Sequence, residues 1–283
     1  MSETDENNSQ LVTIDMVDGV ADVRLNRPEK YNALSPAMFQ AIIAAGEELS
    51  ANKSLRAVVL SGNGPGFCAG LDMATMGGLG DGGGGSDGSD ESGSSEESLL
   101  ARDERPENFA QRPAMVWKRM PVPVIAALHG VAYGGGAQIA LGADIRLAAP
   151  DTKLSIMEIK WGLIPDMSIS QTLRDIVPLD VAKELTFTGR ILSGEEAQVL
   201  GLVTRVVDDP RSEALALARE IAGKSPDAVR ASKQLLETVW HADERTGLEL
   251  ESSLQIALIG SDNQVEAVKA NFEKRPPNFN DPV

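Results

Sequence analysis

The sequence has little of what metal sites, disulfides and membrane spans require. It contains one cysteine and two histidines, and no apolar run reaches the 18 or so residues that a membrane helix needs. The single thiol, Cys68, excludes an internal disulfide and a cysteine-rich zinc site. His129 and His241 are far apart in the chain, so a histidine-based metal site is not expected either. We therefore predict no metal site and no membrane partner.

Basic residues are scarce. The chain has 26 Lys and Arg against 42 Asp and Glu, a formal net charge of −16. Phosphate backbones are bound by clustered cations, so this balance argues against a nucleic-acid partner. The N-terminus is acidic and polar rather than basic and then apolar, so no targeting segment is expected and a cytoplasmic location is the default.

The acidic excess is concentrated in two segments. Residues 1–10 carry three acids and residues 77–98 carry six, and neither segment has a base. The second segment consists of nine Gly, six Ser, those six acids and Leu79. Such a composition cannot bury enough apolar surface to offset its ordering entropy. We expect a disordered tail at 1–10 and a flexible loop at 77–98, which is either a tolerated surface insertion or a mobile flap beside a site.

Outside these two segments, the pattern of the 283-residue chain favours one α/β domain followed by helices. Apolar-polar alternation on both sides of Asp18-Gly19 predicts a hairpin, and Ser35-Pro36 predicts the start of a helix. Strands and helices alternate through the core region 11–207, whereas 208–283 reads as helices alone. This last region cannot extend the sheet, so it must cap the core or pack on another subunit. Expected strands are 56–61, 121–128, 144–149, 153–156 and 202–207, and expected helices are 108–119, 212–223, 226–239, 244–260 and 262–273.

Two glycine-bearing loops follow strands. The loop 62–72 contains a G-x-G-x-x-A match at 64–69, but no second strand with an acidic residue follows, so a dinucleotide site is not expected. In the second loop, Gly134-Gly135-Gly136 stands where a helix begins, where free N–H groups attract negative charge. With a backbone N–H of the first loop, it could form an oxyanion hole. Alternatively, the glycines merely let a strand turn tightly into a helix.

Several segments in this order resemble the crotonase, or enoyl-CoA hydratase/isomerase, superfamily. They are LNRPEKYNAL at 25–34, GFCAGLDM at 66–73, PVIAALHGVAYGGGAQIALGADIRLAA at 123–149, MEIKWGLIPDMS at 157–168 and FTGRILSGEEAQVLGLVTRVV at 187–207. The resemblance spans about residues 11–275, without the insert. It implies a spiral of ββα units, a C-terminal helical trimerisation region, and a homotrimer or dimer of trimers. It also implies an acyl-CoA thioester substrate and no cofactor beyond the coenzyme A that the substrate carries.

The resemblance also implies roles for individual residues. The oxyanion hole would be formed by the backbone N–H groups of Leu71 and Gly135. Substrate and CoA contacts would come from the RPEKYNAL segment, from the two glycine loops and from the segment 157–168: Glu29, Tyr31, Ala33, Ala69, Gly70, Asp72, Met73, Tyr133, Gly134 and Pro165.

The acid/base positions decide the expected activity. Hydratases of this family use two glutamates, and the matching positions here are Gln138 and Glu158. An amide can bind a water but cannot take its proton, whereas Glu158 alone could shuttle a proton between two carbons. Asp166 stands where dienoyl-CoA isomerases of the family carry an Asp, so it could assist, or it could be a helix N-cap before MSISQTL. Gln138 could equally be a helix residue that only packs.

Other candidates have weaker support. We expect His129 to be structural, and Cys68 to pack rather than act as a nucleophile. Lys233 could meet a CoA phosphate in a neighbouring subunit. The sequence therefore predicts an enoyl-CoA hydratase/isomerase-type enzyme in which Glu158 moves a proton and double-bond isomerisation is favoured over hydration. A hydratase of low activity, an acyl-CoA hydrolase and a non-catalytic acyl-CoA binder are the alternatives.

Overall fold

The computed structural model describes residues 11–72 and 99–282. The expected tail at 1–10, the expected loop at 77–98 and the candidate contact Met73 lie outside the described residues. No described helix combines the length and the apolar character that a membrane span requires.

The described chain begins with the expected hairpin. Strands β1 (Val12–Val17) and β2 (Val20–Leu25) pair antiparallel, and Asp18 and Gly19 both adopt positive φ between them. That conformation matches the twist of the two strands, which is why an Asp-Gly pair closes this turn. From β2 onward the main sheet is parallel, in the order β1-β2-β3-β4-β6-β8. Its other strands are β3 (Ala57–Gly62), β4 (Val124–Leu128), β6 (Ile145–Ala148) and β8 (Arg205–Val206).

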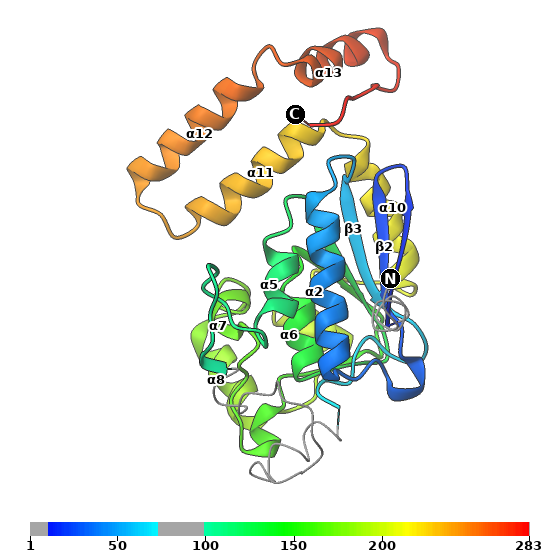
Figure 1. The fold of residues 1–283 in the computed structure, drawn as a ribbon, viewed down its shortest axis with the longest axis vertical. Helices are drawn as coiled ribbons and strands as arrows, with labels where there is room; N and C mark the ends of the chain where they lie inside the picture. Colours follow the sequence, from blue (N-terminus) through cyan, green and yellow to red (C-terminus); the bar gives the residue numbers. More distant parts are fainter. Residues whose placement is uncertain (1–10, 73–98, 283) are drawn as a thin grey trace.

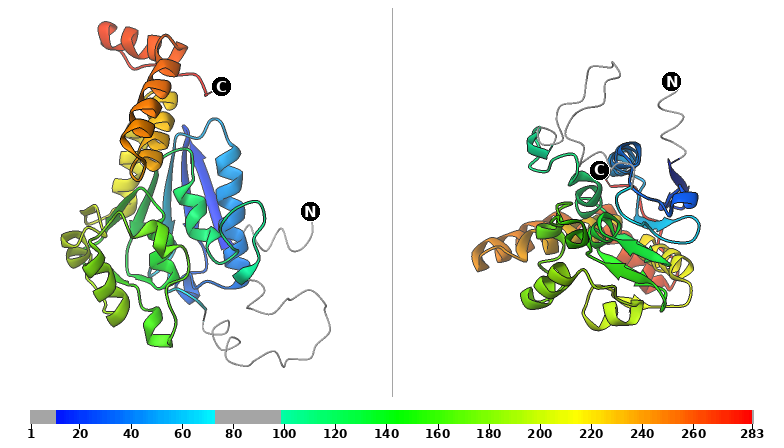
Figure 2. Two further views of the ribbon diagram at one scale, coloured as in Figure 1. Left: turned by 90° about the vertical axis from the view of Figure 1, so that its left-hand side faces the viewer. Right: turned by 90° about the horizontal axis from the view of Figure 1, so that it is seen from below.

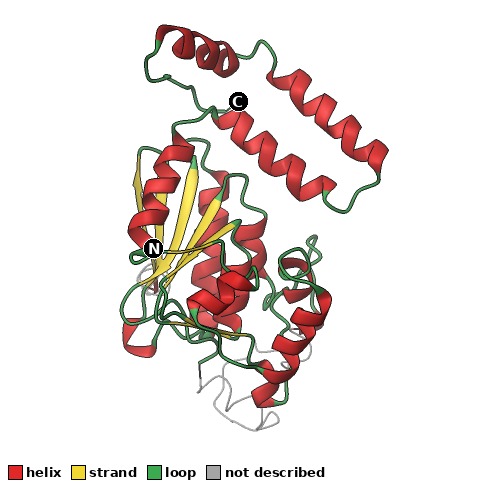
Figure 3. Cartoon of the chain, turned by 180° about the vertical axis from the view of Figure 1, so that it is seen from behind, coloured by secondary structure: helices red, strands yellow, loops and turns green. Residues whose placement is uncertain are grey.

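Helices cover both faces of this sheet. Alternate residues of β3 enter different cores: Val58 and Leu60 face α2 (Pro36–Ala51), α5 (Arg112–Lys118) and α6 (Gly135–Leu141), whereas Val59 faces α10 (Pro210–Ala222). Figures 1 and 3 show α10 on the opposite face from α2, α5 and α6. Because both faces are buried, the parallel strands are almost continuously apolar.

A second, two-stranded sheet lies beside the glycine loops. Strand β5 (Val131–Tyr133) pairs in parallel with β7 (Lys153–Ser155). Each of these short strands follows a strand of the main sheet, and α6 follows β5, which gives the ββα succession that was expected. We did not expect β5 from the sequence, because three residues between Gly130 and Gly134 carry too little periodicity to indicate a strand.

Helix starts follow their local signals. Ser35 Oγ accepts a hydrogen bond from the Met38 amide at the start of α2, and Ser193 forms a capping box with Glu196 at the start of α9 (Gly194–Val199). The helix expected at 108–119 is shorter as α5, and the strand expected at 202–207 is reduced to the two residues of β8. The remaining elements between β7 and β8 are η2 (Glu158–Trp161), α7 (Ile169–Thr172) and α8 (Leu179–Thr188).

The C-terminal helices divide into one that caps the sheet and three that extend past it. Helix α10 packs on the main sheet, while α11 (Pro226–Val239), α12 (Glu244–Leu258) and α13 (Asp262–Glu273) project beyond it (Figures 1 and 2). These three helices leave many large apolar side chains exposed: Leu236, Trp240, Leu248, Ile256, Ile259, Val265, Val268 and Phe272.

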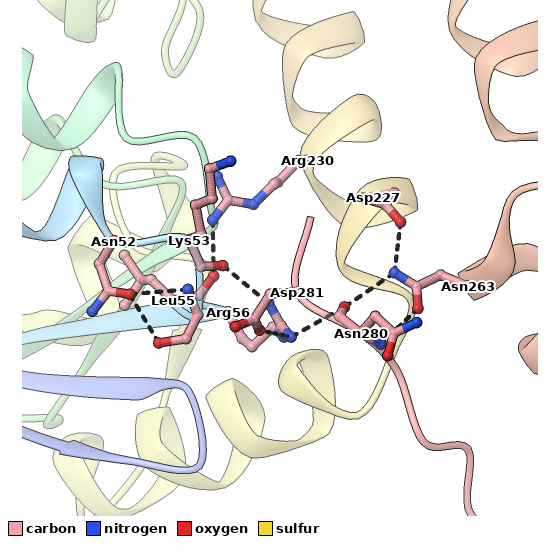
Figure 4. A network of polar contacts seen from close by, with 10 residues as sticks. Asn52, Lys53, Leu55, Arg56, Asp227, Arg230, Asn263, Asn280 and Asp281 are labelled. Atoms are coloured by element: carbon pink, nitrogen blue, oxygen red, sulfur yellow. Dashed lines mark hydrogen bonds and ion pairs between the residues drawn. The ribbon is translucent and has the colours of Figure 1, made fainter. Parts of the chain in front are cut away.

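Polar contacts attach these helices to the core. Arg56, at the start of β3, binds the Asp281 carboxylate at 2.5 Å, and the neighbouring Asn280 exchanges hydrogen bonds with the buried Asn263 of α13 (Figure 4). Lys233 of α11 binds the Asp144 carboxylate at 2.7 Å and the Val122 carbonyl at 3.1 Å, and it is largely buried. This ion pair already engages the ammonium group, which argues against the expectation that Lys233 meets a CoA phosphate in a neighbouring subunit.

Candidate active site

The segment RPEKYNAL forms a tight turn that is organised around one buried amide. After the short helix η1 (Pro28–Lys30), Tyr31 and Asn32 both adopt positive φ. Asn32 is fully buried, and its Nδ2 lies 2.9–3.1 Å from the carbonyl oxygens of Gly66, Phe67 and Asn63. Its Oδ1 accepts a hydrogen bond from the Arg27 amide. Asn32 thus ties this turn to the first glycine loop, a role that we did not predict.

The first glycine loop runs between two other segments and is bonded to both. The Phe67 and Cys68 amides donate to the carbonyls of His129 and Val131, and the Ala69 amide donates to Tyr31 on the other side. Leu34 then pairs with Gly70 and Asp72, which leaves the amide of Leu71 without an acceptor among the described residues. The predicted oxyanion donor Leu71 is therefore free to bind an external oxygen.

The second glycine loop approaches the first one closely. A Cβ atom on Gly70 would lie 2.6 Å from the Tyr133 carbonyl oxygen and 3.6 Å from the Gly135 nitrogen. Gly135 is the first residue of α6, so its amide has no partner within the helix. It finds no backbone acceptor elsewhere in the described chain. The structure therefore brings two unpaired amides, those of Leu71 and Gly135, onto adjoining loops.

The tight-turn explanation also holds for part of the triple glycine. Gly134 has φ +50°, and a Cβ on Gly136 would lie 2.4 Å from the Cys68 carbonyl oxygen. These two glycines are needed for the turn and for close packing. The turn and the free Gly135 amide are consequences of the same backbone path, so the two alternatives are not exclusive.

Glu158 lies beside this second loop. It is the first residue of η2, and its Oε1 would lie 3.3 Å from a Cβ on Gly134. Gln138, which is fully buried in α6, donates from Nε2 to Glu158 Oε1 at 2.6 Å. The other oxygen, Oε2, is enclosed and has no hydrogen-bond partner within the described residues. Burial raises the pKa of Glu158 above its usual 4.5, and the nearby charge of Asp166 acts in the same direction.

Asp166 is near Glu158 but in a different environment. Asp166 as a whole residue is exposed, but its carboxyl group is partly buried, and this burial raises the carboxyl pKa. The helix that follows, α7, begins at Ile169 with Ser168 before it. The alternative in which Asp166 is a helix N-cap is therefore wrong, and its carboxyl group is available near that of Glu158.

The other predicted contacts surround these loops. Glu29 and Tyr31 are exposed on the turn after β2, Ala33 and Gly70 are buried, and Ala69 and Tyr133 are half-buried. Two more positions are committed to the protein itself. The Asp72 carboxylate forms an ion pair with Arg27, and Pro165 is buried before Asp166. Backbone at these positions can still face a ligand, whereas the Asp72 side chain helps to close the turn.

His129 and Cys68 have structural positions. His129 Nε2 donates to the Gly64 carbonyl at 2.9 Å and so joins the strand β4 to the first loop. Cys68 is fully buried, its Sγ lies 3.1 Å from the Asn32 carbonyl, and burial raises its pKa to about 12. A thiol that resists ionisation is a poor nucleophile. Among the described residues, no three His, Cys, Asp or Glu side chains are grouped so that they could hold a metal ion.

Replacing Asn32 with alanine should destabilise the site. The change removes the donor to two buried carbonyls and one part-buried carbonyl and leaves the Arg27 amide without its acceptor, which we expect to cost about 2–4 kcal/mol of unfolding free energy. Urea unfolding measures this loss. Asn52→Ala is the control: the oxygen of this amide accepts from Ser54 in its own turn, and its nitrogen lies 3.5 Å from the Met16 sulfur. Equal losses in both variants would contradict the proposed role of Asn32.

Comparison with known proteins agrees with this geometry. A sequence profile described as enoyl-CoA hydratase/isomerase matches residues 15–282. The mitochondrial methylglutaconyl-CoA hydratase of Mus musculus is 31% identical over 271 residues, which cover 92% of this chain and 79% of that protein. The peroxisomal Delta(3,5)-Delta(2,4)-dienoyl-CoA isomerase of Arabidopsis thaliana is 34% identical over 259 residues, 90% of each chain.

Comparison of the fold with solved structures agrees with the sequence comparison. The crystal structure of an enoyl-CoA hydratase from Bacillus anthracis superimposes with a TM-score of 0.83 at 29% identity, covering 95% of this chain and 99% of that one. The profile match spans nearly the whole chain, both glycine loops and the Glu158 segment included. The chain therefore belongs to the enoyl-CoA hydratase/isomerase family of the crotonase superfamily.

Proposed function

We propose that this protein moves a double bond in an enoyl-CoA, with Glu158 as its single proton-transfer group. One observation supports this proposal most strongly. Of the two positions where a hydratase would have glutamates, one holds the amide of Gln138. The other holds Glu158, whose Oε2 is enclosed and has no hydrogen-bond partner within the described residues. An amide cannot accept the proton of a water at neutral pH. Hydration would lack one of its two carboxylates, whereas isomerisation needs only one.

The proposed reaction begins at the thioester. Its oxygen accepts hydrogen bonds from the Leu71 and Gly135 amides, which stabilise negative charge on that oxygen. Glu158 removes the proton at C2 of a 3-enoyl-CoA, and the electron pair of the C2–H bond forms a dienolate. Glu158 then returns the proton to C4, so that the double bond moves from C3–C4 to C2–C3. The proton that leaves C2 is the proton that C4 receives, so atoms and charge balance. The proposed reaction uses no cofactor other than the coenzyme A of the substrate.

Purified protein assayed by absorbance on 3-enoyl-, 2-enoyl- and dienoyl-CoA tests this proposal. We expect the fastest turnover with the 3-enoyl substrate. Faster hydration of the 2-enoyl substrate, or release of free CoA, would replace the proposal with hydratase or hydrolase activity. Binding without turnover would make the protein an acyl-CoA binder.

A second candidate uses two carboxylates on a conjugated substrate. Asp166 lies close enough to Glu158 for their charges to interact, and it has no capping role. Two such groups can exchange protons at distant carbons of a dienoyl chain. Asp166→Asn would then remove dienoyl-CoA turnover while leaving 3-enoyl-CoA turnover within about twofold, which is the result that separates the two candidates.

The pH dependence should reveal the buried base. Glu158 must be ionised to remove a proton, so kcat/KM falls as pH drops through its pKa. Because burial raises that pKa above 4.5, we expect the acidic decline to have its midpoint above this value. A profile measured with 3-enoyl-CoA in buffers of constant ionic strength provides the midpoint. A midpoint at or below 4.5 would contradict the assignment of Glu158 as base.

We also propose that the chain self-associates through α11, α12 and α13, as a homotrimer or a dimer of trimers. The exposed apolar side chains of this region, among them Trp240, Ile256 and Phe272, support the proposal, because contiguous apolar surface marks sites of protein–protein contact. Light scattering coupled to gel filtration distinguishes one, three and six copies.

A further inference from the structure

The side chain of Gln138 links three separate parts of the site. Its Nε2 donates to Glu158 Oε1 at 2.6 Å, and its Oε1 accepts from the Met167 amide at 2.9 Å. Gln138 is fully buried. Both ends of the amide are therefore already hydrogen-bonded inside the protein, and these two bonds fix its orientation.

The hydrogen-bond pattern distinguishes the two oxygens of Glu158. Oε1 is held by Gln138, whereas Oε2 has no partner within the described residues. An ionised oxygen that is not hydrogen-bonded is the more basic of the two. The amide thus selects which oxygen accepts a proton and fixes the direction in which the carboxylate presents it.

The same amide holds the segment that follows η2. Met167 is adjacent to Asp166, and its sulfur would lie 2.6 Å from a Cβ on Gly135. A displacement of Met167 would therefore reach both the second carboxylate and the loop of the Gly135 amide. Gln138 lies in the same helix as Gly135, so α6 carries one oxyanion donor together with the residue that orients the base.

We propose that Gln138 is a positioning residue that fixes Glu158 with Oε2 free for proton transfer and ties the Asp166 segment to the helix of the oxyanion loop. This inference rests on the proposed role of Glu158 as the proton-transfer group. It is an alternative to the expectation that Gln138 binds water or the acyl chain.

The charged groups around Glu158 make the role testable by pH. Asp166 is the one charged side chain, among the described residues, whose field shifts the pKa of Glu158. Helix α8, which carries Asp180, Lys183 and Glu184, packs against η2. The Gln138 amide is the neutral side chain that stabilises the ionised form of Glu158. Its replacement should therefore change the titration of Glu158 directly.

Two substitutions have opposite expected signatures. Gln138→Met removes the donor, so the acidic decline of kcat/KM should move to higher pH, and kcat should fall roughly 10- to 100-fold with KM little changed. Gln138→Glu places a second carboxyl group against Glu158 Oε1. While the pair shares one proton, the introduced group donates as the amide does, and activity is retained. Once that proton leaves, two anions repel each other, so a decline on the alkaline side should appear.

The experiment measures pH profiles of 3-enoyl-CoA isomerisation for the wild type, both variants, and Gln198→Glu as a control at an exposed position of α9. Unchanged profiles and kcat in both Gln138 variants would overturn the inference, as would faster crotonyl-CoA hydration in Gln138→Glu with no alkaline decline. If no acyl-CoA is turned over, the proposed function fails by itself. Carboxyl titration by ¹³C NMR, with the Glu158 signal assigned from the Glu158→Gln variant, then tests the positioning role without turnover. The pKa of Glu158 should rise in Gln138→Met, and an unchanged value would refute the role.

Discussion

Glu158→Gln is expected to lower turnover of a 3-enoyl-CoA by at least about 10³-fold. The substitution keeps the shape of the side chain and an oxygen that can accept from Gln138 Nε2 at the position of Oε1. It removes the basic oxygen Oε2, and the largely buried carboxylate beside the first glycine loop, that of Asp72, is held in an ion pair with Arg27. Steady-state kinetics measures the loss, and calorimetry with a saturated acyl-CoA should give an affinity within about threefold of the wild type.

A matched control separates this effect from a general loss of charge. Glu195→Gln changes an exposed glutamate in the first turn of α9, away from the loops, and should leave kcat unchanged. Full activity in Glu158→Gln would mean that another group moves the proton.

The same substitution should stabilise the fold. Because the folded-state pKa of Glu158 is raised, its ionised form is disfavoured in the native protein. The stability associated with the neutral form is present below the unfolded pKa and is lost as pH rises through the folded one. Glutamine stays neutral at all pH, so the melting temperature of Glu158→Gln should exceed that of the wild type at neutral pH but not in acid.

Gly70→Ala should cost about 10²–10³-fold in kcat by separating the two oxyanion amides. Gly70 has φ +85°, and the new methyl group would lie 2.6 Å from the Tyr133 carbonyl oxygen, a contact that the backbone cannot absorb in place. Either loop must move, which changes the distance between the Leu71 and Gly135 amides. Kinetics with 3-enoyl-CoA and thermal unfolding together report the two consequences.

The control for Gly70→Ala carries the same backbone strain without the clash. Gly260, between α12 and α13, has φ +78°, and a Cβ there would meet nothing within 4 Å. Gly260→Ala should therefore lower stability by about 1 kcal/mol and leave kcat unchanged. Similar losses of kcat in both variants would show that strain, and not loop separation, reduces turnover.

Predictions from the sequence succeeded where the signal is local. The Asp18-Gly19 turn and the Ser35 cap depend on the conformational preferences of a few adjacent residues, and both appear as expected. The order of the loop motifs was also sufficient to identify the family. The two free amides could be expected on the same basis, since the glycines that shape their loops stand in those motifs.

The roles of Asn32, Gln138 and Asp166 were not predictable in this way. Asn32 bonds to residues 31–35 positions away, and Gln138 bonds to residues 20 and 29 positions away. The Asp166 cap failed because Ser168, with φ +71°, precedes the helix instead. None of these contacts leaves a periodic or positional trace, since each depends on where distant segments lie.

The sequence alone determined most of the elements, their order, the family, and the presence of Gln138 where hydratases of the family have the first of two glutamates. Only the tertiary structure decided that Gln138 donates to Glu158 Oε1 and that Oε2 has no partner within the described residues. The physical reason is that helices and turns are selected by backbone preferences and short-range hydrogen bonds, which adjacent residues fix. The basicity of a buried carboxylate is set by desolvation and by donors from elsewhere in the chain, and these exist only once the parallel strands have brought the loops together.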